Sequence, residues 1–539
     1  SLQMKKLLLF VALFITMPVA AGQLPDNMYF RAMQDEMKRT VKELRTKEKD
    51  GQKPFYVVYK LTRDLGGYNV SASMGSPLPV FSFGNFVLAD VLVDVGSRQH
   101  DSLGFDRNSR WEPYAPTNTS IMPNGYDGIR QGLWGATNTE FVKVNEVYKE
   151  KQAYKRKKNL LNEKTPDFAP AAQSSYVEEL NPLPYPDMQV WQEVVNKLSS
   201  QGKDLPYVEK LEVSAQFYQT GTYYLNSDGG FYQTFYPAGN VYWNAVLRTK
   251  NGYKDTESEW LPLSSWNATD NEKRLQEKTD KFLEKIKQHY QAQKGTAYLG
   301  PVLFTKDAAG SFMGLLVRGV EKNKPLLSAA FEDDPEAGEL RNKVGMRVMS
   351  MVADVYDRPH LREFKGRRLP NFAPVDDEGV ATQDLTIVSG GKLVQLPSSR
   401  RSVKKGEKSN GHAFFLNSYP RERLTTVVVE PKNPLSEKEL EAKLLARCKE
   451  LELDYCYIVP NMGGTGTMVQ RIYTADGRKE PVTGLEVSNL TTRALRDILA
   501  AGDESDVYSN VITPALLVDE IELLPSDRRP DRKPFIARP

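Results

Sequence analysis

Apolar residues recur every three or four positions in several stretches of the chain, which is the pattern of a helix with one buried face. The stretches with this spacing are residues 27–46, 128–162, 191–198, 275–290, 308–320 and 436–451. Ser436 and Glu439 also match a capping box, which marks the first turn of the last of these helices. A further helix is expected around residues 495–499, ending near Gly502.

Apolar runs that are short, or that alternate with polar residues, predict strands between the helices. These runs fall at residues 56–60, 87–95, 211–217, 223–225, 231–235, 301–304, 385–388, 393–396, 425–429, 454–459 and 515–523. Asp228 with Gly229, and Asp476 with Gly477, supply the residues of tight hairpin turns. Strands and helices mix without regular strand–helix–strand alternation, which predicts an α+β fold.

The length of the chain and a proline-rich stretch suggest several domains. The 539 residues are enough for about three domains of ordinary size, and a proline-rich stretch at residues 166–186 reads as a linker. We expect a signal peptide at residues 1–21, an N-terminal α+β domain at 22–125, a middle domain of helices and a β-meander at 126–295, a C-terminal mixed α+β domain at 296–525 and a disordered tail at 526–539.

The first residues predict export. Lys5 and Lys6 precede a short apolar run at residues 7–16, and small residues at 19–21 suit cleavage before Gly22. A retained anchor is the alternative, because cleavage cannot be seen in a sequence. Later segments of the sequence lack the ~20 apolar residues of a spanning helix. We therefore expect a protein without a membrane span, in the periplasm or at the outer surface.

Composition narrows the partners. The 72 basic and 69 acidic residues give a net charge of only +3, so nucleic acid is not an expected partner. Export would permit a disulfide between the two cysteines, Cys448 and Cys456. Cys448 falls on the apolar face of a helix and Cys456 in the strand that follows, which favours two buried free thiols.

Residues suited to metal-dependent hydrolysis are sparse. The histidines are His100, His289, His360 and His412, and they stand far apart without any two-histidine motif. The acidic run at residues 376–378 could hold a hard cation, but a turn before the strand at residue 385 is the favoured interpretation. A non-standard metal site would have to combine His360 with Asp354, or with this acidic run.

Four short segments carry a family resemblance. They are Gly-Pro-Val-Leu at residues 300–303, Val-Asp-Asp-Glu-Gly-Val-Ala-Thr at 375–382, Ser-Asn-Gly at 409–411 and Pro-Val-Thr-Gly at 481–484. In this order and spacing, the region from residue 296 to residue 523 resembles the TldD/PmbA family of peptidases and peptidase-like proteins, particularly its exported members. Weaker similarity covers residues 28–43, 53–59 and 133–167, so the resemblance spans most of the mature chain.

The resemblance implies an altered zinc site. Active members carry a His-Glu-three-residues-His motif on the helix after the Gly-Pro-Val strand, and a Cys near the C-terminus as the third zinc ligand. The corresponding positions here are Gly314, Leu315 and Gly319, and residues 500–518 contain no Cys. The resemblance therefore implies a chain without catalytic residues and without the zinc cofactor of its family.

The resemblance also implies partners. Metal-free members pair with an active subunit and enclose a cleft for extended peptides, so we expect a homo- or heterodimer with a TldD/PmbA relative and an extended peptide ligand. The expected peptide-cleft residues are Asp376, Asp377, Glu378, Gly379, Asn410 and Gly411. Two alternatives remain open at this point: an active metallopeptidase with a non-standard metal site, and an envelope binding protein unrelated to peptides.

Overall fold

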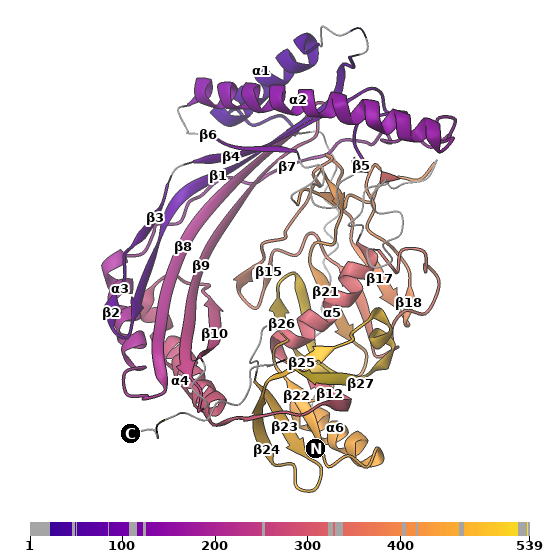
Figure 1. Cartoon of the computed structure of the whole chain (residues 1–539). Helices are drawn as coiled ribbons and strands as arrows, with labels where there is room; N and C mark the ends of the chain where they lie inside the picture. Colours follow the sequence, from indigo (N-terminus) through magenta and orange to yellow (C-terminus); the bar gives the residue numbers. More distant parts are fainter. Residues whose placement is uncertain are drawn as a thin grey trace, which may run out of the picture.

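The fold is α+β, as the sequence predicts, and Figure 1 shows a computed structural model of the chain. The structure describes residues 22–45, 49, 51–84, 86–106, 116–121, 125–250, 254–321, 327–328, 338–401, 406–416, 419–462, 468–526 and 536. The expected signal peptide and nearly all of the expected C-terminal tail lie outside these residues. Both therefore stay predictions.

The first of two large sheets is built from long antiparallel strands. Its strand order is β10-β9-β8-β1-β4-β6, and the short strands β2, β3 and β7 pair at its sides. The bounds are β1 Pro54–Ser73, β2 Ser76–Pro77, β3 Phe81–Phe83, β4 Val87–Val95, β6 Thr117–Ile121, β7 Ser175–Val177, β8 Val208–Asn226, β9 Phe231–Arg248 and β10 Lys254–Pro262. The predicted turn at Asp228 and Gly229 joins β8 to β9, where Gly229 has the positive φ of 100° that such a turn requires.

The two segments that the sequence separates at residue 125 contribute strands to this one sheet. β1 pairs with β4 on one side and with β8 on the other, where the register runs from Val58 opposite Asn226 to Ser73 opposite Glu212. The expected boundary at residue 125 therefore falls inside a single sheet. A pairing between strands so distant in the chain leaves no local pattern in the sequence, which is why the long strands read as separate domains.

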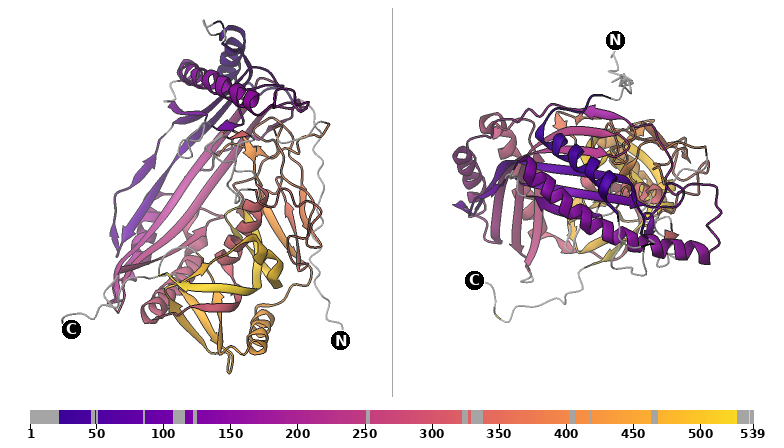
Figure 2. Two further views of the ribbon diagram at one scale, coloured as in Figure 1. Left: turned by 45° about the vertical axis from the view of Figure 1, so that its right-hand side comes forward. Right: turned by 90° about the horizontal axis from the view of Figure 1, so that it is seen from above.

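Four helices cover this sheet. They are α1 Met28–Glu43, α2 Tyr126–Lys157, α3 Met188–Ser200 and α4 Ala268–Gln291. α1 and α2 lie across one end of the sheet, while α3 and α4 pack on its outer face (Figures 1 and 2). On that face Val213 and Trp243 alternate with residues of the inner face, and they form a core with Trp191 of α3 and Phe282 of α4. The alternation of apolar and polar residues that predicts these strands thus arises because only one face of each strand packs into this core.

The second large sheet forms the C-terminal half. Its strand order is β11-β24-β23-β22-β12-β27-β21-β14-β17-β18, and β25 and β26 pair with β27. The bounds are β11 Gln293–Lys294, β12 Tyr298–Phe304, β14 Ala353–Asp357, β17 Leu385–Ser389, β18 Lys392–Leu393, β21 Val427–Pro431, β22 Tyr455–Val459, β23 Val469–Tyr473, β24 Lys479–Thr483, β25 Leu485–Ser488, β26 Ile498–Tyr508 and β27 Val511–Pro525.

Helices α5 Lys306–Val320 and α6 Glu437–Glu450 accompany the second sheet, and α6 begins with the predicted capping box. Among the described residues there are also three two-stranded sheets. One joins the two halves, pairing β5 Phe105–Asp106 with β13 Leu327–Ser328. The other two pair β15 Glu363–Phe364 with β16 Arg367–Arg368, and β19 Ala413–Phe414 with β20 Arg421–Glu422. The C-terminal half faces the inner side of the bowed first sheet (Figure 1). Within the described ranges, no helix combines the length and the apolar character of a membrane span.

Two expectations for the C-terminal half are wrong. The helix expected around residues 495–499 is a 3₁₀ helix, η1 Thr492–Asp497, followed directly by β26. A short apolar run fits either periodicity, and pairing with β27 decides in favour of the strand. Cys448 and Cys456 form a disulfide rather than two free thiols. The bond joins α6 to the adjacent strand β22, a contact that depends on how the helix packs.

Candidate functional site

A cleft of about 800 Å³ opens between the two halves of the chain. Its walls come from β10 and α4 on one side, and from the start of α5, the β15–β16 hairpin, β22, β23 and β26 on the other. Apolar groups such as Phe282, Ile458 and Met468 share the walls with many charged side chains. The size is that of a ligand site.

β10 presents its edge to the cleft. It is the last strand of the first sheet and pairs only with β9 among the described strands. All residues from 256 to 262 line the cleft. Because successive side chains of a strand point to opposite faces, a continuous run of lining residues indicates that the cleft lies along the strand's edge. The backbone groups of such an edge can pair with an added extended chain.

α4 supports β10 through a row of ion pairs. Lys285 Nζ lies 3.1 Å from Glu257 and 3.2 Å from Glu259. His289 is held between Glu257 and Asp255, at 2.6 Å from Nδ1 and 3.0 Å from Nε2. Burial opposes the charged form of His289, but its two carboxylate partners outweigh burial and raise its pKa to about 9. These carboxylates alternate along β10, so one face of the strand is held by α4.

The altered motif lies on α5, and its residues do not fit a zinc centre. Gly314 and Gly319 offer no ligand atom, and Leu315 carries no carboxylate and is only 8% exposed. Leu340 fills the space beside Gly319: a Cβ there would lie 2.7 Å from Leu340 Cδ1. A glycine inside a helix lowers the helix's stability by roughly 1 kcal/mol relative to Ala. At Gly319 the close contact with Leu340 explains why a glycine is nevertheless present.

The described strands beside α5 supply no replacement ligand. β26 packs on α5 through Tyr508, whose Cβ would lie 2.6 Å from a Cβ added at Gly310. This is the stretch where active family members are expected to carry the third ligand, and it contains no Cys. Among the described residues, the structure brings no three His, Cys, Asp or Glu side chains together in a way that could hold a metal ion.

Six residues are expected from the sequence to line a peptide cleft, but none of them lines the cleft beside β10. They are Asp376, Asp377, Glu378, Gly379, Asn410 and Gly411. The acidic run forms a turn, as the sequence favours, but the turn is buried. Asp376 accepts hydrogen bonds from the backbone of Glu378, Val380 and Ala413 at 2.9–3.1 Å. Burial, and then the neighbouring Glu378, raise the pKa of Asp376 above its ordinary value. Such a carboxylate stabilises a loop rather than facing solvent.

Asp377 reaches back to the first sheet. Tyr232 of β9 donates to Asp377 Oδ1 at 2.6 Å, and Lys60 of β1 lies 3.1 Å from Oδ2. Gly379 has a φ of 77°, and a Cβ there would collide with Gln173. The turn therefore fills a junction between the halves, where a side chain at residue 379 has no room.

Asn410 and Gly411 are also structural. Asn410 accepts from the Ser398 backbone and donates to the Leu396 carbonyl, both at 2.8 Å. Gly411 has a φ of 75°, and a Cβ there would lie 2.4 Å from the Ala381 carbonyl oxygen. Both residues fix the loops that surround the acidic turn.

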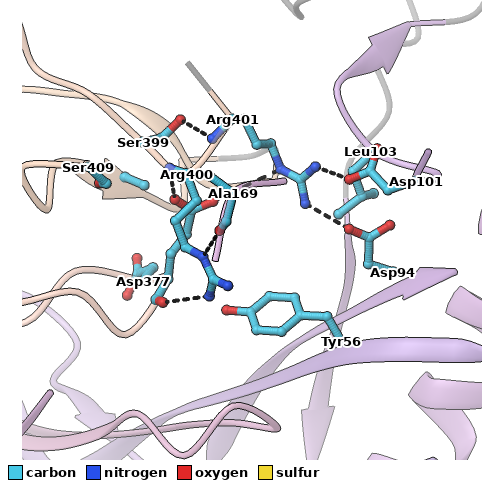
Figure 3. Close-up of polar contacts among 12 residues, drawn as sticks. Tyr56, Asp94, Asp101, Leu103, Ala169, Asp377, Ser399, Arg400, Arg401 and Ser409 are labelled. Atoms are coloured by element: carbon cyan, nitrogen blue, oxygen red, sulfur yellow. Dashed lines mark hydrogen bonds and ion pairs between the residues drawn. The ribbon is translucent and has the colours of Figure 1, made fainter. Parts of the chain in front are cut away.

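Two neighbouring arginines complete the junction, as Figure 3 shows. Arg401 pairs with Asp94 and Asp101 of the N-terminal half, and Lys151 of α2 pairs with Asp101 at 2.5 Å. Arg400 lies over the ring of Phe168 at 3.9 Å. We call Asp94, Asp101, Lys151, Glu378, Arg400 and Arg401 the buried ion cluster.

The charges of the buried ion cluster perturb one another. Burial raises the pKa of Glu378 to about 7, against the opposing effect of Arg401 and Arg400. Burial also raises the pKa of Asp94, and the charge of Asp101 adds to the effect. Asp101 behaves differently, because Arg401 and Lys151 overcome burial and lower its pKa below the ordinary value. The pKa shifts of Asp94 and Asp101 thus run in opposite directions, because Lys151 contacts Asp101 in addition to Arg401.

The residues of the non-standard metal hypothesis have other partners. His360 Nε2 lies 2.8 Å from Thr382 Oγ1. Asp354 accepts from the Gly390 backbone at 2.9 Å and lies 3.5 Å from Lys432. His412 is fully buried and lies 2.7 Å from Asp357. These contacts hold loops and strands in place.

Sequence reasoning missed the cleft itself. The stretch 254–262 has polar or charged residues at nearly every position before Trp260, which is typical of an edge strand and is the signal that could have located it. Arg367 of the β15–β16 hairpin also lines the cleft. A pair of two-residue strands leaves no periodic pattern, so the sequence offers no comparable signal for Arg367.

A family model and a curated relative both match the C-terminal half of the chain. Residues 297–524 match the family model for the PmbA/TldA metallopeptidase C-terminal domain. A curated relative from Haemophilus influenzae, a metalloprotease PmbA homologue, is 24% identical over 234 residues. That match covers 41% of this chain and 45% of the relative, so it spans less than half the length of that protein.

Solved structures share the fold of nearly the whole chain. TldE from Thermococcus kodakarensis has a TM-score of 0.58 at 13% identity, covering 92% of this chain and 100% of that one. A proposed modulator of DNA gyrase from Bacteroides thetaiotaomicron has a TM-score of 0.59 at 11% identity, covering 92% and 98%. A second proposed gyrase modulator, from Thermotoga maritima, has a TM-score of 0.56 at 14% identity, covering 87% and 95%. Residues 297–524 thus form a PmbA/TldA metallopeptidase C-terminal domain, and 92% of the chain shares its fold with TldE.

Proposed function

We propose that this chain is an exported, non-catalytic member of the TldD/PmbA family that binds extended peptides in the cleft, alone or as the partner subunit of an active relative. The observation that carries the proposal is the state of α5. Gly314, Leu315 and Gly319 replace two imidazoles and a carboxylate, and Leu340 packs into the space beside Gly319. Without those groups the motif can neither hold zinc nor activate water.

Two further observations support the proposal. The open edge of β10 runs along the cleft and offers main-chain pairing, which accepts extended peptides of many sequences. The Cys448–Cys456 disulfide suits an oxidising compartment outside the cytoplasm. Export and peptide binding are thus argued from different parts of the molecule.

The test combines metal analysis with peptide binding. The purified full chain is analysed for zinc and titrated by calorimetry with an acetylated, amidated hexapeptide of alternating Thr and Val, with and without a chelator. We expect substoichiometric zinc, binding that the chelator does not change, and an intact peptide after long incubation. Stoichiometric zinc together with chelator-sensitive cleavage would show an active metallopeptidase instead.

A matched pair of variants tests whether the peptide binds along β10. Ser258 lies in β10 on the cleft, and Ser82 lies in β3, away from it in the same sheet; both are exposed. Ser258→Arg should weaken peptide binding about tenfold or more, because the new side chain fills part of the cleft, whereas Ser82→Arg should leave it unchanged. Equal effects of the two substitutions would rule out binding at β10.

The partner-subunit role has its own measurement. A relative that carries the intact His-Glu-three-residues-His motif is mixed with this chain, and the mass of the product is determined by light scattering after gel filtration. A stable complex supports the partner role. If the two chains elute separately at micromolar concentration, the partner role fails while peptide binding by the chain alone can still hold.

A further inference from the structure

Arg367 is a half-buried cation of the cleft that forms no ion pair within the part of the chain that the structure describes. Arg367 lies in β16 and lines the cleft, and its side chain is half-buried. Among the described residues, the structure gives its guanidinium neither a hydrogen bond nor an ion pair within 4 Å. Burial lowers the pKa of Arg367 below its ordinary value, while Tyr236 and Asp506 act in the opposite direction without pairing with it.

The guanidinium is nevertheless held in a defined place. It lies over the ring of Trp260, with 4.6 Å between the guanidinium carbon and the ring centroid. Trp260 in turn stacks on Tyr242, which is its direct neighbour across β9 and β10, at 6.4 Å and 18°. An arginine stacked on an aromatic ring keeps its N–H groups free at its periphery. Those donors are therefore available beside the edge of β10.

Neighbouring cations differ from Arg367 in being satisfied. Arg368, the next residue, donates to Glu178 and to the Phe235 carbonyl, both at 2.8 Å. Lys365 binds Glu504 and the Ser505 carbonyl at 3.2 and 2.8 Å. Arg367 differs from both neighbours, because its half-buried guanidinium forms no hydrogen bond or ion pair with a described residue, and the carboxylate of Asp506 acts on it only from a distance.

We infer that Arg367 binds a carboxylate of the peptide, supplied either by its C-terminus or by an acidic side chain. The inference rests on the proposed function, because it assumes a peptide paired with the edge of β10. Such a peptide passes Trp260, so a carboxylate at that position of the peptide lies beside the guanidinium of Arg367. Arginine and carboxylate form charge-assisted, often bidentate hydrogen bonds, so Arg367 makes the cleft selective for peptides that carry a carboxylate at this position.

Three peptides test the inference by calorimetry on the full chain. All are acetylated hexapeptides of alternating Thr and Val: one has a free C-terminal carboxylate, one is amidated, and one is amidated with Glu as its last residue. Wild type should bind at least one carboxylate form about tenfold tighter than the neutral amide, the gain expected of one charge-assisted pair. The form that gains shows which carboxylate is read.

Variants connect the preference to the residue. Arg367→Gln should bind all three peptides equally, with the affinity that wild type shows for the neutral amide, while Arg367→Lys should keep part of the preference. Lys197 is the matched control, because it is an exposed cation of α3 that does not line the cleft. Lys197→Gln should keep the full preference. Equal melting temperatures establish that the variants are folded.

The outcomes separate this inference from the function on which it rests. If wild type binds the neutral amide but shows no preference for a carboxylate, or if Arg367→Gln keeps the preference, the role of Arg367 is overturned and peptide binding stands. If wild type binds none of the three peptides, the proposed function fails, and the inference fails with it.

Discussion

Arg401 donates a hydrogen bond from Nη2 to Asp94 Oδ2 at 2.9 Å, although 307 residues separate the two in the chain. The same guanidinium pairs with Asp101, and all three side chains are buried. Asp94 lies near the end of β4 in the first sheet, whereas Arg401 lies in the C-terminal half, beyond β18. The contact therefore holds the two halves in the arrangement that forms the cleft.

Removing this arginine should be costly. Arg401→Ala leaves Asp94 and Asp101 buried without their main cation, and breaking a buried ion pair from one side costs about 3–5 kcal/mol. The free energy of unfolding, measured by denaturant titration, should fall by that amount. The control is Arg493→Ala, since Arg493 is an exposed arginine of η1, and such surface changes stay within about 0.5 kcal/mol. A variant as stable as wild type would disprove the importance of the contact.

Two glycines of α5 should respond to alanine in opposite directions. Gly314→Ala meets only the flexible end of Arg318, at 3.0 Å, so it should stabilise the helix by about 0.5–1 kcal/mol. Gly319→Ala meets Leu340 at 2.7 Å and should destabilise the protein by about 1–3 kcal/mol. Thermal unfolding of the two variants beside wild type measures the difference. Equal shifts would mean that Leu340 can move aside freely.

His289 should make stability depend on alkaline pH. Its folded pKa of about 9 lies above the ordinary value of 6.5, so its contribution is fully present below about pH 6.5 and is lost as the pH rises through about 9. A pKa difference of one between the folded and unfolded states is worth about 1.36 kcal/mol, which makes the full contribution about 3 kcal/mol. Asp255 and Glu257 bind the ring, with Lys285 beside them.

The measurement compares wild type with His289→Gln from about pH 6 to pH 10 by denaturant unfolding. The gap between their free energies of unfolding should be widest near pH 6, should narrow from about pH 6.5 upward, and should be lost above about pH 9. A gap that is constant over the whole range would show that the ring acts by packing and not by charge.

The disulfide should contribute measurably despite its short loop. Cys448 and Cys456 are 8 residues apart, and closing a loop of that size in the unfolded chain is worth about 2–3 kcal/mol. A double variant, Cys448→Ala with Cys456→Ala, should lose that stability relative to oxidised wild type. Wild type treated with a thiol reductant should lose it too. If reduction leaves the unfolding midpoint where it was, the bond adds nothing to stability.

Local patterns predict local structure well in this chain. The helix at residues 308–320 corresponds to α5, the capping box at Ser436 begins α6, and the turn at Asp228 joins β8 to β9. Each depends on neighbours within a few residues. The short run at 495–499 fails because its periodicity is ambiguous, and pairing with distant β27 determines its structure.

The site was less predictable for a physical reason. The segments that resemble family motifs include the acidic turn, but sequence alone cannot tell a residue that faces a ligand from one that faces the other half of the protein. Asp376 and Gly379 therefore looked like cleft residues and are buried at the junction. Trp260 and Arg367 become neighbours only when the halves come together.

The open edge of β10 also has a consequence for solubility. The unpaired backbone groups of an edge strand can pair with the same edge of another copy of the protein, and this pairing leads to aggregation. Here the opposite wall of the cleft, with β22, β23 and β26, stands in front of that edge. A single extended segment can enter, but a second folded sheet with its own α4 attached cannot. The C-terminal half thus shields the unpaired backbone groups of β10 from the sheet edges of other copies, while it leaves room for one extended segment.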